Sequence, residues 1–116
     1  MQMEDLEEAI RESWGKDTCY PAWQDRWSPD NPALGQCLVT SLVVQDYFKG
    51  ELVYCKHNDH YWNLLTNGKR IDFTKEQFPP ETVICIDDVH LREDLLENPK
   101  TKERYELLKK RVMEKL

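Results

Sequence analysis

The strongest turn signal in the chain is Thr66-Asn67-Gly68, which separates two short segments rich in strand-forming residues, 60–65 and 69–73. Such a turn between two such segments predicts a β-hairpin. Two loops suit this sequence: a two-residue type I′ turn at Asn67-Gly68, or a three-residue loop with Gly68 in a left-handed conformation. The choice matters, because a shift of one residue moves every side chain of a strand to the opposite face.

Helices are expected on both sides of this hairpin. Apolar residues at every fourth position predict a helix over 4–14, and a broad apolar stripe predicts a second helix that ends near Phe48. The second helix starts either at Asn31-Pro32 or later, just before Gln36. A last helix is expected from about Lys100 to the end, and its lysines and arginines, interleaved with glutamates, indicate a solvated face rather than an anion-binding patch.

Further strands are expected at 52–56 and 83–86, and an irregular connection at 15–34. The resulting order predicts an α+β fold, with N-terminal helices packed on a small, mainly antiparallel sheet and with a C-terminal helix. We expect residues 1–116 to form a single domain, because a chain of this length can bury one ordinary core.

Composition and charge exclude several classes of protein. The formal net charge of −6 disfavours a nucleic-acid-binding surface, and the apolar runs are too short to span a membrane. No secretory signal is visible, so we expect a cytoplasmic protein whose four cysteines, Cys19, Cys37, Cys55 and Cys85, are reduced thiols. Nucleotide motifs are lacking, and the spacing of Cys55, His57 and His60 is not that of a structural zinc site, so neither cofactor nor metal is expected.

Cys37, His60 and Asp72 are the best candidates for a working site. Cys37 lies at or near the start of the second helix, where the helix dipole and a nearby imidazole favour a reactive thiolate. An arbitrary cysteine is more often a small buried apolar residue. Asp72 lies between two apolar residues, a setting in which a carboxylate usually has a partner.

The loop of the hairpin decides whether His60 and Asp72 meet. With a two-residue turn, Asp72 pairs across from Asn63 and lies on the face opposite His60. With a three-residue loop, Asp72 pairs across from Trp62 and is a diagonal, same-face neighbour of His60. The catalytic interpretation requires the three-residue loop.

Three groups of residues resemble the bacterial YunG-like family. They are Gln36-Cys37 at a helix start, His60-Tyr61-Trp62-Asn63 on one strand, and the segment 71–78 after the hairpin. The ending from Asn98-Pro99 onward is similar to that family as well, so the resemblance covers most of the chain from about Trp14.

A more distant similarity is to transglutaminase-like and papain-like cysteine enzymes, and it rests on Cys37, His60 with Trp62, and Asp72 with Thr74. It implies a reduced core of that fold and a catalytic triad. In that triad Cys37 is the nucleophile, His60 its base and Asp72 the residue that orients the imidazole. Further oxyanion or cleft candidates are Gln36 or Gln24, together with Trp62 and Asn63.

Two functions of different classes follow. The first is a thiol-dependent hydrolase or acyl transferase that acts on an amide or thioester, such as a peptide or a small amide, through a covalent acyl-enzyme. The second is a non-catalytic domain of the same fold that binds a protein partner through the tryptophan-rich loop, with Trp23 and Trp27 as contact residues.

Overall fold

Helices and a four-stranded sheet make up the computed structural model, which describes residues 1–116. The α-helices are α1 (Met3–Ser13), α2 (Cys37–Phe48), α3 (Arg92–Leu95) and α4 (Pro99–Lys115). The strands are β1 (Glu51–Cys55), β2 (His60–Leu64), β3 (Arg70–Ile71) and β4 (Asp88–His90). Short 3-10 helices, η1 (Lys16–Thr18), η2 (Pro21–Arg26) and η3 (Lys75–Gln77), occupy the connections.

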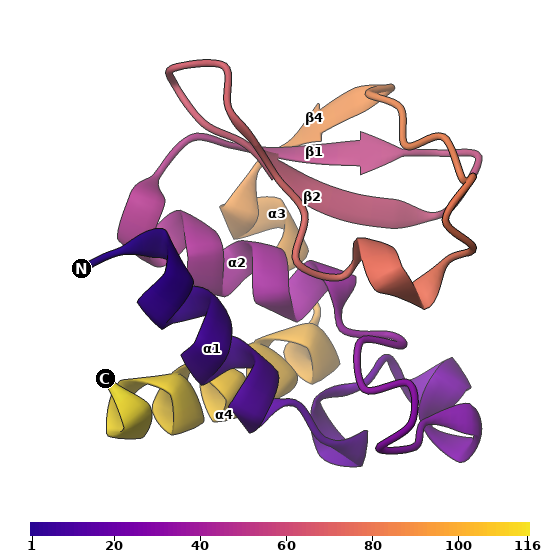
Figure 1. Cartoon of the computed structure of the whole chain (residues 1–116), viewed down its shortest axis with the longest axis vertical. Helices are drawn as coiled ribbons and strands as arrows, with labels where there is room; N and C mark the ends of the chain where they lie inside the picture. Colours follow the sequence, from indigo (N-terminus) through magenta and orange to yellow (C-terminus); the bar gives the residue numbers. More distant parts are fainter.

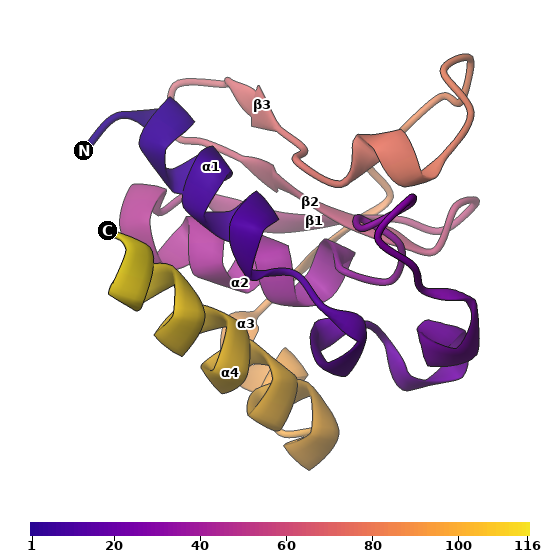
Figure 2. The ribbon, with the colours of Figure 1, turned by 60° about the horizontal axis from the view of Figure 1, so that its bottom comes forward.

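The sheet is antiparallel throughout, with the strand order β3-β2-β1-β4. Figures 1 and 2 show α2 between the sheet and α4, with α1 beside α4 and the two chain ends on the same side of the molecule. Helix α2 packs on β1 and β2, and α4 packs on both α1 and α2. The predicted α+β class, with helices on a small antiparallel sheet and a C-terminal helix, is therefore confirmed.

The core lies between these layers, because each element turns its apolar stripe toward α2. Helix α2 itself is buried on every side from Val39 to Val44, which fits its place between the sheet and α4. Four of the surrounding elements contribute buried apolar side chains to this core: Leu6 and Ile10 from α1, Leu52 from β1, Ile71 from β3, and Leu108 and Val112 from α4.

The hairpin closes with the three-residue loop. The N–H of Leu65 donates to the carbonyl of Lys69 at 2.9 Å, and Gly68 has a φ of +83°, a conformation that glycine adopts without steric cost. Asn63 pairs with Ile71 and Leu64 with Arg70, so continuing the register places Asp72 across from Trp62. Of the two registers open to the sequence, the structure has the one that brings Asp72 and His60 to the same face.

The structure decides where α2 begins and corrects the position of the fourth strand. Helix α2 begins at Cys37, the later of the two starts. The expected strand at 83–86 is wrong: the fourth strand is β4, which pairs with the free edge of β1 a few residues later. Residues 83–86 make isolated contacts instead, among them the bond that the Trp62 indole N–H donates to the Cys85 carbonyl at 3.1 Å.

The expectation of four reduced thiols is wrong for two of them. Cys55 and Cys85 form a disulfide across 30 residues of sequence, which ties the end of β1 to the segment before β4. Cys19 and Cys37 are free. No helix of this structure has both the length and the apolar character needed to cross a bilayer.

Candidate functional site

Cys37 is the first residue of α2 and is only partly buried. The chain reaches it through a turn at Gly35, whose φ of +72° favours glycine. The first N–H groups of a helix have no earlier helical carbonyl to bond, and they form the positive end of its dipole. The thiol therefore lies where a negative charge on sulfur, or on a group bound beside it, is stabilised.

His60 and Asp72 form a hydrogen-bonded pair. Nε2 of the fully buried imidazole lies 2.9 Å from Oδ1 and 2.8 Å from Oδ2 of Asp72. Nδ1 is also buried and has no hydrogen-bond partner. The edge of the ring contacts Phe78, which packs at a right angle to it. The carboxylate thus fixes the ring through one nitrogen and leaves the other nitrogen free for another group.

Cys37 also affects the pKa of this imidazole. Burial alone would lower the pKa of His60, but the hydrogen bond to Asp72 and the charges of Cys37 and Asp72 outweigh burial and raise the pKa to about 9. The pKa of Tyr61 is raised to about 12, mainly by burial and in second place by the charge of Cys37. Since Nε2 is bonded to Asp72, Nδ1 is the ring nitrogen that remains unbonded.

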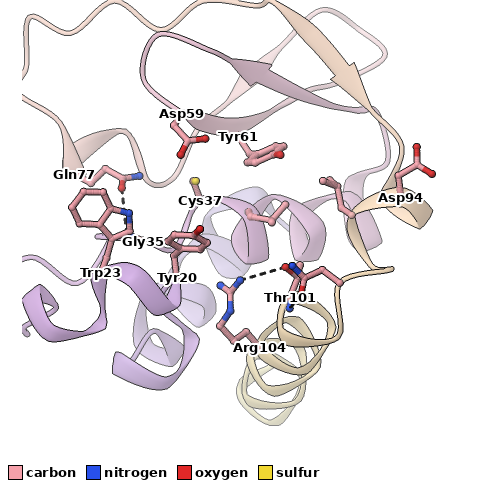
Figure 3. A pocket seen from close by; sticks show the side chains of 13 residues that line it. Tyr20, Trp23, Gly35, Cys37, Asp59, Tyr61, Gln77, Asp94, Thr101 and Arg104 are labelled. Carbon is pink, nitrogen blue, oxygen red and sulfur yellow. Dashed lines mark hydrogen bonds between the residues drawn. The ribbon is translucent and has the colours of Figure 1, made fainter.

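The ends of two elements bring these groups together. Asn63 donates to the Ser41 carbonyl of α2 at 2.9 Å, so alternation along β2 directs His60 and Trp62 away from the body of that helix. His60 is, however, the first residue of β2, and its neighbours Asp59 and Tyr61 line the same cavity as Cys37 (Figure 3). The start of β2 and the start of α2 therefore border the same cavity.

A cavity of about 340 Å³ opens beside the sulfur. Its walls come from the loop before α2, from the turn before β2, from η3 and from the start of α4. Figure 3 shows the Cys37 sulfur between Gln77 and Tyr61, with the guanidinium of Arg104 on the opposite wall near Tyr20. A small molecule that entered this cavity would lie against the thiol.

The four other predicted oxyanion or cleft residues do not line this cavity; their side chains hold the fold together. Gln36 is fully buried, and its Nε2 donates to the Gly15 carbonyl at 2.9 Å. Gln24 donates to the Cys19 carbonyl at 3.1 Å. The indole of Trp62 is buried and bonded to the Cys85 carbonyl, and Asn63 is bonded to α2 as described above.

Gln77 is a site residue that the sequence did not reveal. Its Oε1 accepts from the N–H of Gly35 at 3.3 Å, which ties η3 to the turn before Cys37. Its Nε2 is buried and has no partner, and Figure 3 shows this amide directed toward the sulfur. Only packing brings the two residues together, since they lie 40 positions apart and no local motif links them.

Arg104 is the second missed residue, and it corrects the expectation that the charged face of α4 is solvated. It is 7% exposed, and its Nη2 lies 3.4 Å from the Thr101 hydroxyl. Its guanidinium lies over the Tyr20 ring at 5.8 Å. A periodic charge pattern does not distinguish one inward arginine from its exposed neighbours, so the sequence carried no signal for it.

The tryptophan-rich loop contributes to the cavity through one of its two predicted contact residues. Trp23 lines the cavity and is 39% exposed, with Arg26 stacked on its ring. The indole of Trp27 instead donates to the Pro32 carbonyl at 2.9 Å and holds the loop together. Elsewhere, Cys55, Cys85 and Asp87 lie close enough to share an ion, but the disulfide already joins the two sulfurs.

Comparison with known proteins assigns the chain to a family without a characterised activity. The family model described as YunG protein matches residues 2–116. The uncharacterised protein YunG of Bacillus subtilis (strain 168) is 35% identical over 78 residues, which span 66% of this chain and 63% of that protein. No solved structure matches the chain significantly. Because the family model covers almost all of the sequence, the chain belongs to the YunG family.

Proposed function

We propose that this protein is a thiol-dependent hydrolase or acyl transferase that acts on an amide or thioester through an acyl group carried on Cys37. The observation that supports this most is the set of contacts around His60. Its ring is held by Asp72 at 2.8 Å, its pKa is raised in part by the charge of Cys37, and the Cys37 thiol lines a cavity. A nucleophile, a base and a group that orients the base are the three parts that covalent catalysis by cysteine needs.

The reaction would run in two halves. The Cys37 thiolate attacks the carbonyl carbon, a carbon–sulfur bond forms, and the imidazolium of His60 gives its proton to the leaving amine or thiol. Water or an acceptor amine then attacks the thioester while His60 takes up a proton from it, and the Cys37 thiolate leaves. Asp72 keeps the ring oriented and stabilises its charged form in both halves.

Two donors are available for the oxyanion that forms when sulfur attacks. The backbone N–H of Cys37 is unbonded at the start of α2, and the Nε2 of Gln77 is buried, without a partner and directed toward the sulfur. Donors already in place for a charge that develops in the transition state give the largest electrostatic contribution to catalysis. Gln77 takes the role that the sequence suggested for Gln36 or Gln24.

The second function, a binding domain without catalysis, is favoured by one observation. Tyr20 and Trp23 are 48% and 39% exposed at the cavity, and exposed aromatic side chains are typical contact residues. This function requires the cavity but not the thiol, so chemistry at Cys37 separates the two proposals.

Reaction with p-nitrophenyl acetate tests the enzymatic proposal. We expect release of p-nitrophenol with an acetyl group left on Cys37, detected by mass spectrometry of the intact and the digested protein. Cys37→Ser should abolish the thioester, and His60→Ala should slow acetylation by about a hundredfold or more. Cys19 is an internal control, because burial raises the pKa of its thiol to about 11.

Acetylation of Cys37 no faster than that of a free thiol such as N-acetylcysteine would refute the proposal. The same conclusion would follow if His60→Ala reacted at the wild-type rate. A folded protein with an unreactive Cys37, which nevertheless loses a partner on Trp23→Ala, would favour the binding function.

A further inference from the structure

Arg104 is a buried cation without an anionic partner. It is 7% exposed, yet none of the ion pairs in the structure includes it. Its one hydrogen bond is the 3.4 Å contact with the Thr101 hydroxyl, and its buried Nε has no partner. Leaving a buried charge without a counter-charge is costly, so a bound anion beside Arg104 would stabilise it.

No carboxylate of the protein faces the guanidinium of Arg104. Burial lowers its pKa, and the ionisable groups that act in the opposite direction are two thiols and a phenol: Cys19, Cys37 and Tyr20. Asp59 and Asp94 also line the cavity, but both are exposed. Figure 3 shows Asp59 above the sulfur and Asp94 turned away, so neither faces the guanidinium.

The cavity joins this cation to the thiol. Arg104 and Cys37 line the same space of about 340 Å³, which is large enough for a small molecule but not for a folded partner. Arg104 is the only lysine or arginine among the lining residues. One planar guanidinium beside one hydroxyl matches a single carboxylate, whereas a phosphate dianion usually requires more positive charge.

We infer that the acyl compound bound in this cavity carries a carboxylate, which Arg104 and Thr101 hold while its carbonyl carbon faces Cys37. The substrate class is therefore an anionic amide or thioester, such as an amide of a carboxylated amine, rather than a neutral one. This inference rests on the proposed function for the role of Cys37, but the anion site itself is a property of Arg104.

Two alkylating agents that differ in one group test this inference. Iodoacetate carries a carboxylate where iodoacetamide carries a neutral amide, and both transfer their carbon to sulfur with loss of iodide. The measurement is the rate constant for iodoacetate divided by that for iodoacetamide at Cys37. This ratio is then divided by the same ratio for N-acetylcysteine at equal ionic strength. We expect this ratio to fall by about tenfold on Arg104→Gln, since hydrogen bonds to charged groups are the strong ones.

Lys102→Gln is the matched control. It removes one positive charge from the exposed face of the same helix and should leave the ratio within about twofold of wild type. If circular dichroism shows that Arg104→Gln does not fold, Arg104→Lys replaces it. That variant keeps the positive charge but loses the planar guanidinium with its two parallel donors. Its ratio should therefore lie between the ratio of wild type and the ratio of a free thiol.

The outcomes separate the two proposals. An unchanged ratio in the folded Arg104 variant, or the same fall in Lys102→Gln, would overturn the anion site even if p-nitrophenyl acetate acetylates Cys37. A ratio that falls only with Arg104 would support the anion site even if acetylation failed, and the cavity would then bind a carboxylate without catalysis.

Discussion

Replacing Asp72 with asparagine should change how the stability of the protein depends on pH. The substitution keeps the shape of the side chain but removes the charge that lies 2.8 Å from Nε2 of His60. The pKa of His60 is raised from an ordinary 6.5 to about 9, with Asp72 as the largest of the contributions that raise it. Without the carboxylate, burial should bring this pKa down toward or below its ordinary value.

The size of the effect follows from the difference between the two pKa values. A histidine whose pKa is raised on folding stabilises the folded state fully below its unfolded pKa, and it loses that contribution as pH rises through the folded pKa. A rise from 6.5 to about 9 corresponds to about 3 kcal/mol at low pH. Part of this rise comes from the charge of Cys37, so about 2 kcal/mol is expected for Asp72.

Urea denaturation followed by tryptophan fluorescence, from about pH 6 to about pH 10, measures this contribution. Wild type should exceed Asp72→Asn by about 2 kcal/mol at the acidic end, and the gap should close as pH rises through about 9. Asp25→Asn, which removes an exposed carboxylate, should give no such gap. A difference between wild type and Asp72→Asn that stays constant across this range would refute the reasoning.

Three further predictions concern the disulfide, Gln77 and the turn at Gly35. Replacing Cys55 and Cys85 together by alanine should lower the free energy of unfolding by about 3 to 4 kcal/mol, as a closed loop of 30 residues implies, measured in urea. Gln77→Ala should slow acetylation of Cys37 by about a hundredfold, yet change its alkylation by iodoacetamide, which forms no oxyanion, by less than about twofold. Gly35→Ala should destabilise by about 1 to 2 kcal/mol in urea, because its φ is +72° and the new Cβ would clash with the Cys19 sulfur and lie 3.0 Å from the Tyr20 nitrogen.

Each of these has a clear negative outcome. Equal stability of the double cysteine variant and wild type under oxidising conditions would show that the disulfide does not constrain the unfolded chain. Equal slowing of acetylation and alkylation in Gln77→Ala would indicate displacement of Cys37 rather than loss of an oxyanion donor. A Gly35→Ala protein as stable as wild type would show that this turn can rearrange.

The features that could be predicted from the sequence depend on local patterns. The hairpin follows from Thr66-Asn67-Gly68, and the pairing of His60 with Asp72 follows from one of two countable registers. Sequence alone could not choose between those registers, because both loops suit the same three residues. The structure chooses through the Leu65–Lys69 bond and the left-handed Gly68.

The features that were missed depend on contacts between distant segments. Cys85 lies in the segment 83–86, where the sequence predicts a strand that the structure lacks, and its disulfide to Cys55 follows from the path of the chain between η3 and β4. Gln77 reaches the site because η3 folds back onto Gly35. Arg104 is on a helix whose charge pattern predicts exposure, and it is buried beside the ring of Tyr20, which comes from the distant segment before α2.

The pH dependence of Cys37 alkylation by neutral iodoacetamide tests most directly whether thiol and imidazole act as one unit. We expect Cys37 to react faster than N-acetylcysteine at about pH 6, where an ordinary thiol is almost fully protonated, and to lose this advantage in His60→Ala. A rate that instead rises with pH as for a free thiol, and is the same with and without His60, would contradict the account.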